Sequence, residues 1–129
     1  MHDTLDYIFK EGFMTNTQRK ITEVCEEIKE MLLEKNRCYG DSAINPVRIF
    51  SSVNTIEQLN IRIDDKLSRI QRGTEYEDDD TELDLIGYLI LKRVKLRLLK
   101  IVKDAAAVSE ASEQKDEYGL TFGNIYTGA

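Results

Sequence analysis

Apolar side chains recur at steps of three and four residues in three separate stretches of this 129-residue chain. Such spacing places them on one face of a helix, and it predicts helices over 17–37, 55–71 and 80–107. Apolar residues on more than one face at 83–91 predict that the third helix is central. Thr55 followed by Gln58 predicts a capping box at the start of the second helix, and Gly73 predicts its end. We therefore expect an all-α fold, a helical bundle of three main helices with short terminal helices.

The segment 35–52 interrupts the helical pattern with several turn-forming residues close together. Gly40, Asp41, Ser42, Asn45 and Pro46 predict a loop at this point. Aromatic and apolar residues within the segment predict that the loop packs against the helices, and these residues are Tyr39, Ile44, Val47, Ile49 and Phe50. The pattern divides the chain into one domain, 1–107, and a C-terminal tail, 108–129, for which two interpretations stay open: a frayed end, or a segment that docks on a partner subunit.

Composition narrows the functional classes. The net charge of −6 argues against a protein that binds duplex nucleic acid, which normally presents a basic face to the phosphates. Residues 85–91 form the longest apolar run, which is too short to span a bilayer, so no membrane contact is expected. The start of the chain does not resemble a signal peptide, and we expect a cytoplasmic protein with two free cysteines, Cys25 and Cys38.

Carboxylates are the main candidates for chemistry, because a single histidine cannot build a His-rich metal site and sits near the N-terminus. Mg²⁺ prefers carboxylate oxygens, and Mn²⁺ can take the same ligands. Three helices packed side by side would bring four carboxylates together as metal ligands that also orient water. These are Glu27 and Glu30 of the first helix, Asp65 of the second and Asp84 of the third. Phosphate charge would be neutralised by Lys35, Lys66 or Arg69.

A second interpretation of the same residues stays open. Acidic and basic residues on amphipathic helices ordinarily form a solvated surface. Asp65 with Arg62 and Arg69 fits a ladder of intrahelical ion pairs, each worth a few tenths of a kcal/mol. Tyr39 and Tyr88 would then be aromatic residues of the core.

Three stretches follow one another in an order and spacing known from one family: KNRCYGDSAINP, RIDDKLSRI and DTELDLIGYLIL. They resemble the first nucleotide-modification-associated domain of phages and bacteria. That family shows a KN-x-x-YGDS loop, an R-I-[ED]-DK-x-x-R helix and a D-T-x-x-DL-x-x-Y helix. The resemblance covers about residues 23–95. The family is similar in turn to MazG-like all-α nucleoside triphosphate pyrophosphohydrolases, whose E-x-x-E and E-x-x-D helices bind Mg²⁺. Thr81 stands here where the second pattern has its Glu, one residue after Asp80.

The resemblance implies that the motif residues hold a nucleotide. In this chain they are Lys35, Asn36, Tyr39, Gly40, Asp41 and Ser42 in the loop, Arg62, Asp65, Lys66 and Arg69 in the second helix, and Asp84 and Tyr88 in the third. Asn36, Tyr39 and Asp41 are expected to shape the pocket for the base or sugar. Gly87 stands where relatives often have Asn, and the absence of a side chain at Gly87 would let a ligand or a helix approach closely.

Two hypotheses of function follow. The first is a Mg²⁺-dependent nucleotide-binding enzyme of phage nucleotide metabolism or DNA base modification, which hydrolyses a (deoxy)nucleoside triphosphate to monophosphate and pyrophosphate. The alternative is a non-catalytic module that sequesters a nucleotide or signal molecule, or that serves as a subunit of a base-modification assembly. Both hypotheses expect a homo-oligomer, in the host cytoplasm if a phage encodes it, because the third helix and the tail are rich in apolar residues.

Overall fold

The computed structural model describes residues 12–73 and 78–118, and its elements there are helices without strands. The three main helices are α2 (Asn16–Tyr39), α3 (Thr55–Arg72) and α4 (Thr81–Tyr118). The expected all-α fold is therefore confirmed. The segment before the first main helix, where a short terminal helix was expected, falls largely in residues 1–11, and the end of the tail falls in 119–129; both ranges lie outside the described residues.

The helix ends follow from local capping. Thr15 and Gln18 form a reciprocal capping box at the start of α2. The cap of α3 is Asn54, whose side-chain oxygen accepts a hydrogen bond of 2.9 Å from the Glu57 backbone N–H. The predicted box starting at Thr55 is therefore wrong by one residue, because the Asn54 side chain takes the capping position. Gly73 ends α3 with a φ of 69°, a conformation that costs glycine little.

The third helix extends well beyond the predicted end at about Ala107. It continues without a break to Tyr118, so half of the predicted tail is helical up to that residue. The polar residues after Ala107 include Glu, Gln and Lys, which favour helix as strongly as many apolar residues do. Polarity alone was therefore a poor signal for the end of this helix.

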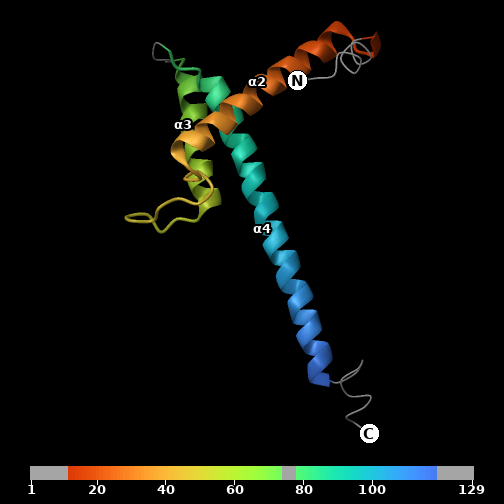
Figure 1. Cartoon of the computed structure of the whole chain (residues 1–129). Coiled ribbons are helices and arrows are strands. Elements are labelled where there is room, and N and C mark those ends of the chain that lie inside the picture. Colours follow the sequence, from red (N-terminus) through yellow and green to blue (C-terminus); the bar gives the residue numbers. More distant parts are fainter. Residues whose placement is uncertain (1–11, 74–77, 119–129) are drawn as a thin grey trace.

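Helices α3 and α4 lie side by side, and α2 crosses the N-terminal part of α4 (Figure 1). The crossing point is Gly87. A Cβ atom at that position would lie 3.3 Å from Leu32 Cδ2 and 3.8 Å from Met31 Cε. The missing side chain of Gly87 therefore allows α2 to approach α4 closely. Of the two expected neighbours of this glycine, a ligand or a helix, the structure shows the helix.

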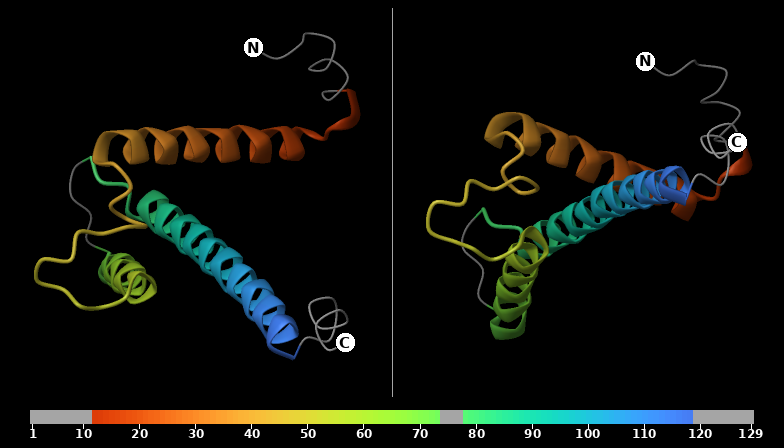
Figure 2. Two further views of the ribbon diagram at one scale, coloured as in Figure 1. Left: turned by 60° about the horizontal axis from the view of Figure 1, so that its bottom comes forward. Right: turned by 90° about the horizontal axis from the view of Figure 1, so that it is seen from below.

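Away from the crossing, α2 and α4 diverge (Figure 2). Only the N-terminal part of α4 is therefore central. The buried apolar residues of the described chain are Ile28, Ile44 and Leu59, which are 9%, 4% and 3% exposed. Such a core is small for a chain of this length, and much of the apolar surface of α2 and α4 faces outward.

The loop between α2 and α3 is folded but packs less than expected. A turn at 40–44 buries Ile44, and Arg48 donates hydrogen bonds to the Val53 carbonyl and, at 3.0 Å, to Thr55 Oγ1. Other predicted anchors are exposed, and these are Tyr39, Val47, Ile49 and Phe50. The expectation that they pack was wrong, because the loop projects away from the helices and leaves these side chains in solvent (Figure 1).

No helix among the described residues is long and apolar enough to cross a membrane. Cys25 and Cys38 are both free and exposed.

Candidate functional site

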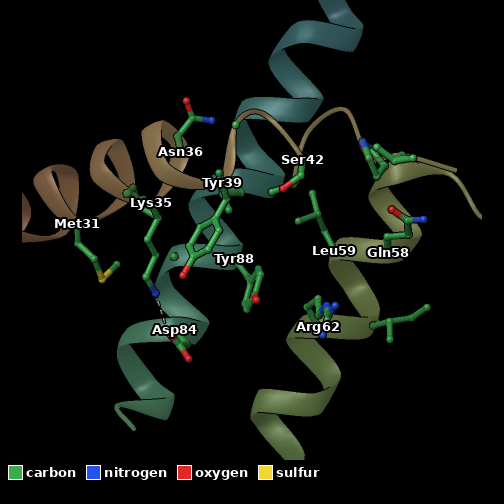
Figure 3. Close-up of a pocket in the computed structure, with 18 residues that line it drawn as sticks. Met31, Lys35, Asn36, Tyr39, Ser42, Gln58, Leu59, Arg62, Asp84 and Tyr88 are labelled. Carbon is green, nitrogen blue, oxygen red and sulfur yellow. Dashed lines mark hydrogen bonds and ion pairs between the residues drawn. The ribbon is translucent and has the colours of Figure 1, made fainter. Parts of the chain in front are cut away.

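A groove of about 840 Å³ lies where α2, the following loop, α3 and α4 meet. Its volume is in the range of small-molecule and cofactor sites. Eight of the motif residues that the sequence singled out line it, and they come from three segments of the chain: Lys35, Asn36, Tyr39, Gly40, Ser42, Arg62, Asp84 and Tyr88. Figure 3 shows how most of them face the groove. Apolar residues including Met31, Leu59 and Leu91 complete the lining.

Asp84 is the charged centre at one end of this groove. Its Oδ1 lies 3.3 Å from Lys35 Nζ of α2, and its Oδ2 lies 3.1 Å from Lys66 Nζ of α3. Lys66 is only 9% exposed, so Asp84 supplies the counter-charge that this nearly buried ammonium group requires. The cluster links all three helices and carries one net positive charge.

The pKa of Asp84 reflects two opposing effects. Burial by itself would raise the pKa, because it disfavours the charged carboxylate. Hydrogen bonds from Lys66 and Lys35, with their charges, outweigh burial and hold the pKa of Asp84 below its ordinary value of 3.8. Asp84 is therefore an anion at neutral pH.

Replacing Asp84 with Asn should lower the free energy of unfolding by about 1–3 kcal/mol at neutral pH, because Lys66 then lacks its counter-charge. Denaturant unfolding measures the loss. Asp64→Asn is the matched control, since Asp64 is exposed on α3 and has no hydrogen-bond or ion-pair partner among the described residues. Equal stability of the two variants would show that the cluster around Asp84 contributes nothing.

The same variant has a predicted pH dependence. A carboxyl group whose pKa is lower in the folded state stabilises the fold above its ordinary pKa, and this contribution is lost as pH falls through the folded value. The stability difference between the unmodified protein and Asp84→Asn should therefore be full at neutral pH and shrink below about pH 4. Unfolding measured over an acid pH series checks this, and a difference that grows on acidification would contradict it.

Arg62 lies on α3 at the opposite side of the groove from Lys35 (Figure 3). Within the described part of the chain, its guanidinium group has no ion-pair or hydrogen-bond partner. Arg69, two helical turns further along α3, instead pairs with Asp65 at 3.3 Å and with Asp79 at 3.6 Å. Arg62 is therefore a cation that faces the groove and can still receive an anion.

Asp41 fixes the shape of the loop that follows α2. Its carboxylate accepts hydrogen bonds from the side chains of Asn36 and Asn45, and its carbonyl accepts from the Ile44 and Asn45 backbone N–H groups. Asp41 therefore holds the turn that places Ser42 at the groove. Asp41 itself does not line the groove, and its predicted contact with a nucleotide stays a prediction.

The four carboxylates predicted as metal ligands do not meet in one chain. Among residues 12–73 and 78–118, no three His, Cys, Asp or Glu side chains lie close enough together to hold a metal ion. Only Asp84 lines the groove, while Asp65 pairs with Arg69 along α3 and Glu30 lies 3.9 Å from Lys29 on the exposed face of α2. Asp80, the substitute ligand, instead caps α4 through the Leu83 backbone N–H at 2.9 Å.

The Mg²⁺ site with Glu27, Glu30, Asp65 and Asp84 thus stays a prediction, and the described residues of one chain do not by themselves fit it. The lysines on both oxygens of Asp84 would have to give way to a metal ion. Lys66 and Arg69 also lie outside the groove lining, and both are held in ion pairs.

Sequence reasoning missed Gln58 as a residue of the groove. The pattern assigned it to helix capping, but it lines the groove one helical turn before Arg62. The spacing of four residues was the available signal, because it places both side chains on the same face of α3. The other missed lining residues are apolar or small and carry no separate chemical signal.

Comparisons with known proteins add no relative. No family model, no curated protein and no solved structure matches this chain.

Proposed function

We propose that this protein binds a nucleotide in the groove between α2, α3 and α4. The observation that supports the proposal is the convergence of Lys35, Tyr39, Arg62 and Tyr88 on one cavity although they are spread over 54 residues of sequence. Asn36, Ser42 and Gln58 add uncharged donors and acceptors to the same lining. Aromatic, cationic and amide groups around an apolar floor are the combination that a nucleotide requires.

The phosphates are assigned to the cationic side chains that line the groove: Arg62 on one side, and on the other Lys35, part of the Lys35–Asp84–Lys66 cluster with its net positive charge. A guanidinium group without a protein partner can bind phosphate oxygens in two parallel hydrogen bonds. The base is assigned to the two tyrosine rings that line the groove, Tyr39 and Tyr88. Tyr39 is 73% exposed, so a stacked base would cover a ring that the protein leaves in water.

Hydrolysis of the bound nucleotide to monophosphate and pyrophosphate is the second candidate function. It is favoured by Asp84, the carboxylate that lines the same groove. A Mg²⁺-dependent reaction would need further carboxylates beside Asp84, which the described residues of one chain do not bring there. Binding is therefore the function that we place first.

The test of both candidates is a panel of ribo- and deoxynucleoside triphosphates incubated with the purified full chain, once with Mg²⁺ and once with EDTA. Calorimetry measures binding, and chromatography with a pyrophosphate assay measures products. Binding that persists in EDTA without product supports the binding function. Monophosphate and pyrophosphate formed only with Mg²⁺ would make the protein a hydrolase.

Absence of binding across the whole panel, by a protein that remains helical, would refute the proposal. Binding that is undiminished when Tyr39 is replaced by Ala would refute the assignment of the base to the tyrosine rings. Tyr39 is a suitable site for this substitution because its exposed side chain supports little of the fold.

A further inference from the structure

Two apolar seams run outward from the crossing of α2 and α4, and their outer parts have no partner in the described chain. On α4 the seam consists of Leu91, Val94, Leu98, Ile101, Ala105 and Val108, and on α2 it consists of Ile21, Val24, Ile28 and Met31. Both alternate steps of three and four residues, which is the spacing of helices that pack along one another. Each seam starts at the crossing, where Met31 approaches Gly87, and runs outward along a diverging arm (Figure 2).

The outer parts of both seams lie in solvent. Ile21 and Val24 are 57% and 51% exposed, and Ile101 and Val108 are 58% and 71% exposed. Every residue from Ile101 to Ser112 is exposed. Apolar surface of this extent on two arms marks an interaction site rather than an ordinary protein surface.

The charges beside the two seams are opposite. Residues 92–103 of α4 carry six basic side chains and no acidic one. Residues 23–34 of α2 carry five acidic side chains and one lysine. Two α4 seams laid together over residues 92–103 would bring like charges into contact, whereas α4 laid on α2 brings opposite charges together.

We propose that a second copy of this chain covers these seams, with the 92–103 segment of each α4 lying on residues 21–34 of α2 of the other copy. The arrangement is reciprocal, as in a dimer with two-fold symmetry, and it makes a four-helix bundle from the two pairs of diverging arms. An antiparallel pair of α4 helices is the alternative that charge also permits, because residues 105–116 contain three acidic side chains and one lysine. That pairing would set 92–103 against Ala105, Ala106 and Ala107, which bury little area, and would leave Ile21 and Val24 uncovered.

Charge reversal distinguishes the two arrangements. Variant one combines Lys95→Glu with Arg97→Glu, two positions that flank the α4 seam. Variant two combines Glu23→Lys with Glu27→Lys, two positions beside the α2 seam. Light scattering after size-exclusion chromatography gives the mass of each protein, and circular dichroism gives its helix content. The matched control is Asp64→Lys with Arg72→Glu, two exposed residues of α3 outside both seams.

We expect the unmodified chain and the control to be dimeric and each seam variant alone to lose the dimer, since like charges then face each other. An equimolar mixture of the two variants should recover a dimer, because both contacts in the mixed pair again join opposite charges. If a seam variant loses helix when alone, recovery of helix on mixing reports the same event. A monomeric unmodified chain would overturn the proposal. The proposal would also be overturned if variant two stays dimeric while variant one dissociates, because that result is expected when α4 pairs with α4.

Discussion

Replacing Arg62 with Ala should weaken nucleotide binding by about 10- to 100-fold, because a charge-assisted hydrogen bond contributes about 1.5–3 kcal/mol. Arg62 lines the groove and has no partner among the described residues, so its removal breaks no internal contact there. The expected loss of stability is therefore small. Calorimetry with the tightest-binding nucleotide of the panel, together with denaturant unfolding, separates the two effects.

Arg72→Ala is the matched control for this prediction. Arg72 lies on the same helix and is exposed, but it does not line the groove. Its removal lowers the net charge by the same amount and should leave the affinity within about twofold, the range of weak exposed charge effects. If both substitutions weaken binding equally, the phosphate is attracted by the overall charge of α3, and the assigned contact with Arg62 is wrong.

Gly87→Leu should separate α2 from α4 and remove the groove. A Cβ atom at this position already lies 3.3 Å from Leu32 Cδ2, so the remaining carbons of a leucine have no space unless α2 moves. Forcing extra carbons into a packed contact costs about 1–3 kcal/mol, and the gain in helix propensity of about 1 kcal/mol offsets part of it. Because Lys35 and Tyr39 are carried by α2, nucleotide binding should fall by more than tenfold.

Two comparisons sharpen this prediction. Gly87→Ala adds one carbon against the flexible end of Leu32 and should change stability by less than about 1 kcal/mol. Ser68→Leu adds a leucine to an exposed position of α3 and should leave both stability and binding unchanged. Binding that survives Gly87→Leu at full strength would show that the approach of α2 to α4 at Gly87 does not shape the site.

The sequence by itself determined the helices. The steps of three and four residues between apolar positions predicted all three, and the ends at Gly40 and Gly73 follow from residues with positive φ. These are local properties, because the neighbours of each residue along the chain decide them. Where the local signal was ambiguous, the prediction was less accurate: Asn54 and Thr55 can both cap a helix, and the polar residues after Ala107 suit a helix as well as a tail.

Only the tertiary structure decided which side chains share a site. Asp65 and Asp84 are both acidic residues on amphipathic helices, and nothing in their spacing reveals that one faces a groove while the other pairs along its own helix. That difference depends on how α3 packs along α4 and on the angle at which α2 crosses α4, which the space at Gly87 allows. The same angle makes the arms of α2 and α4 diverge and leaves two apolar seams uncovered, since contacts between distant segments are set by packing and not by local pattern.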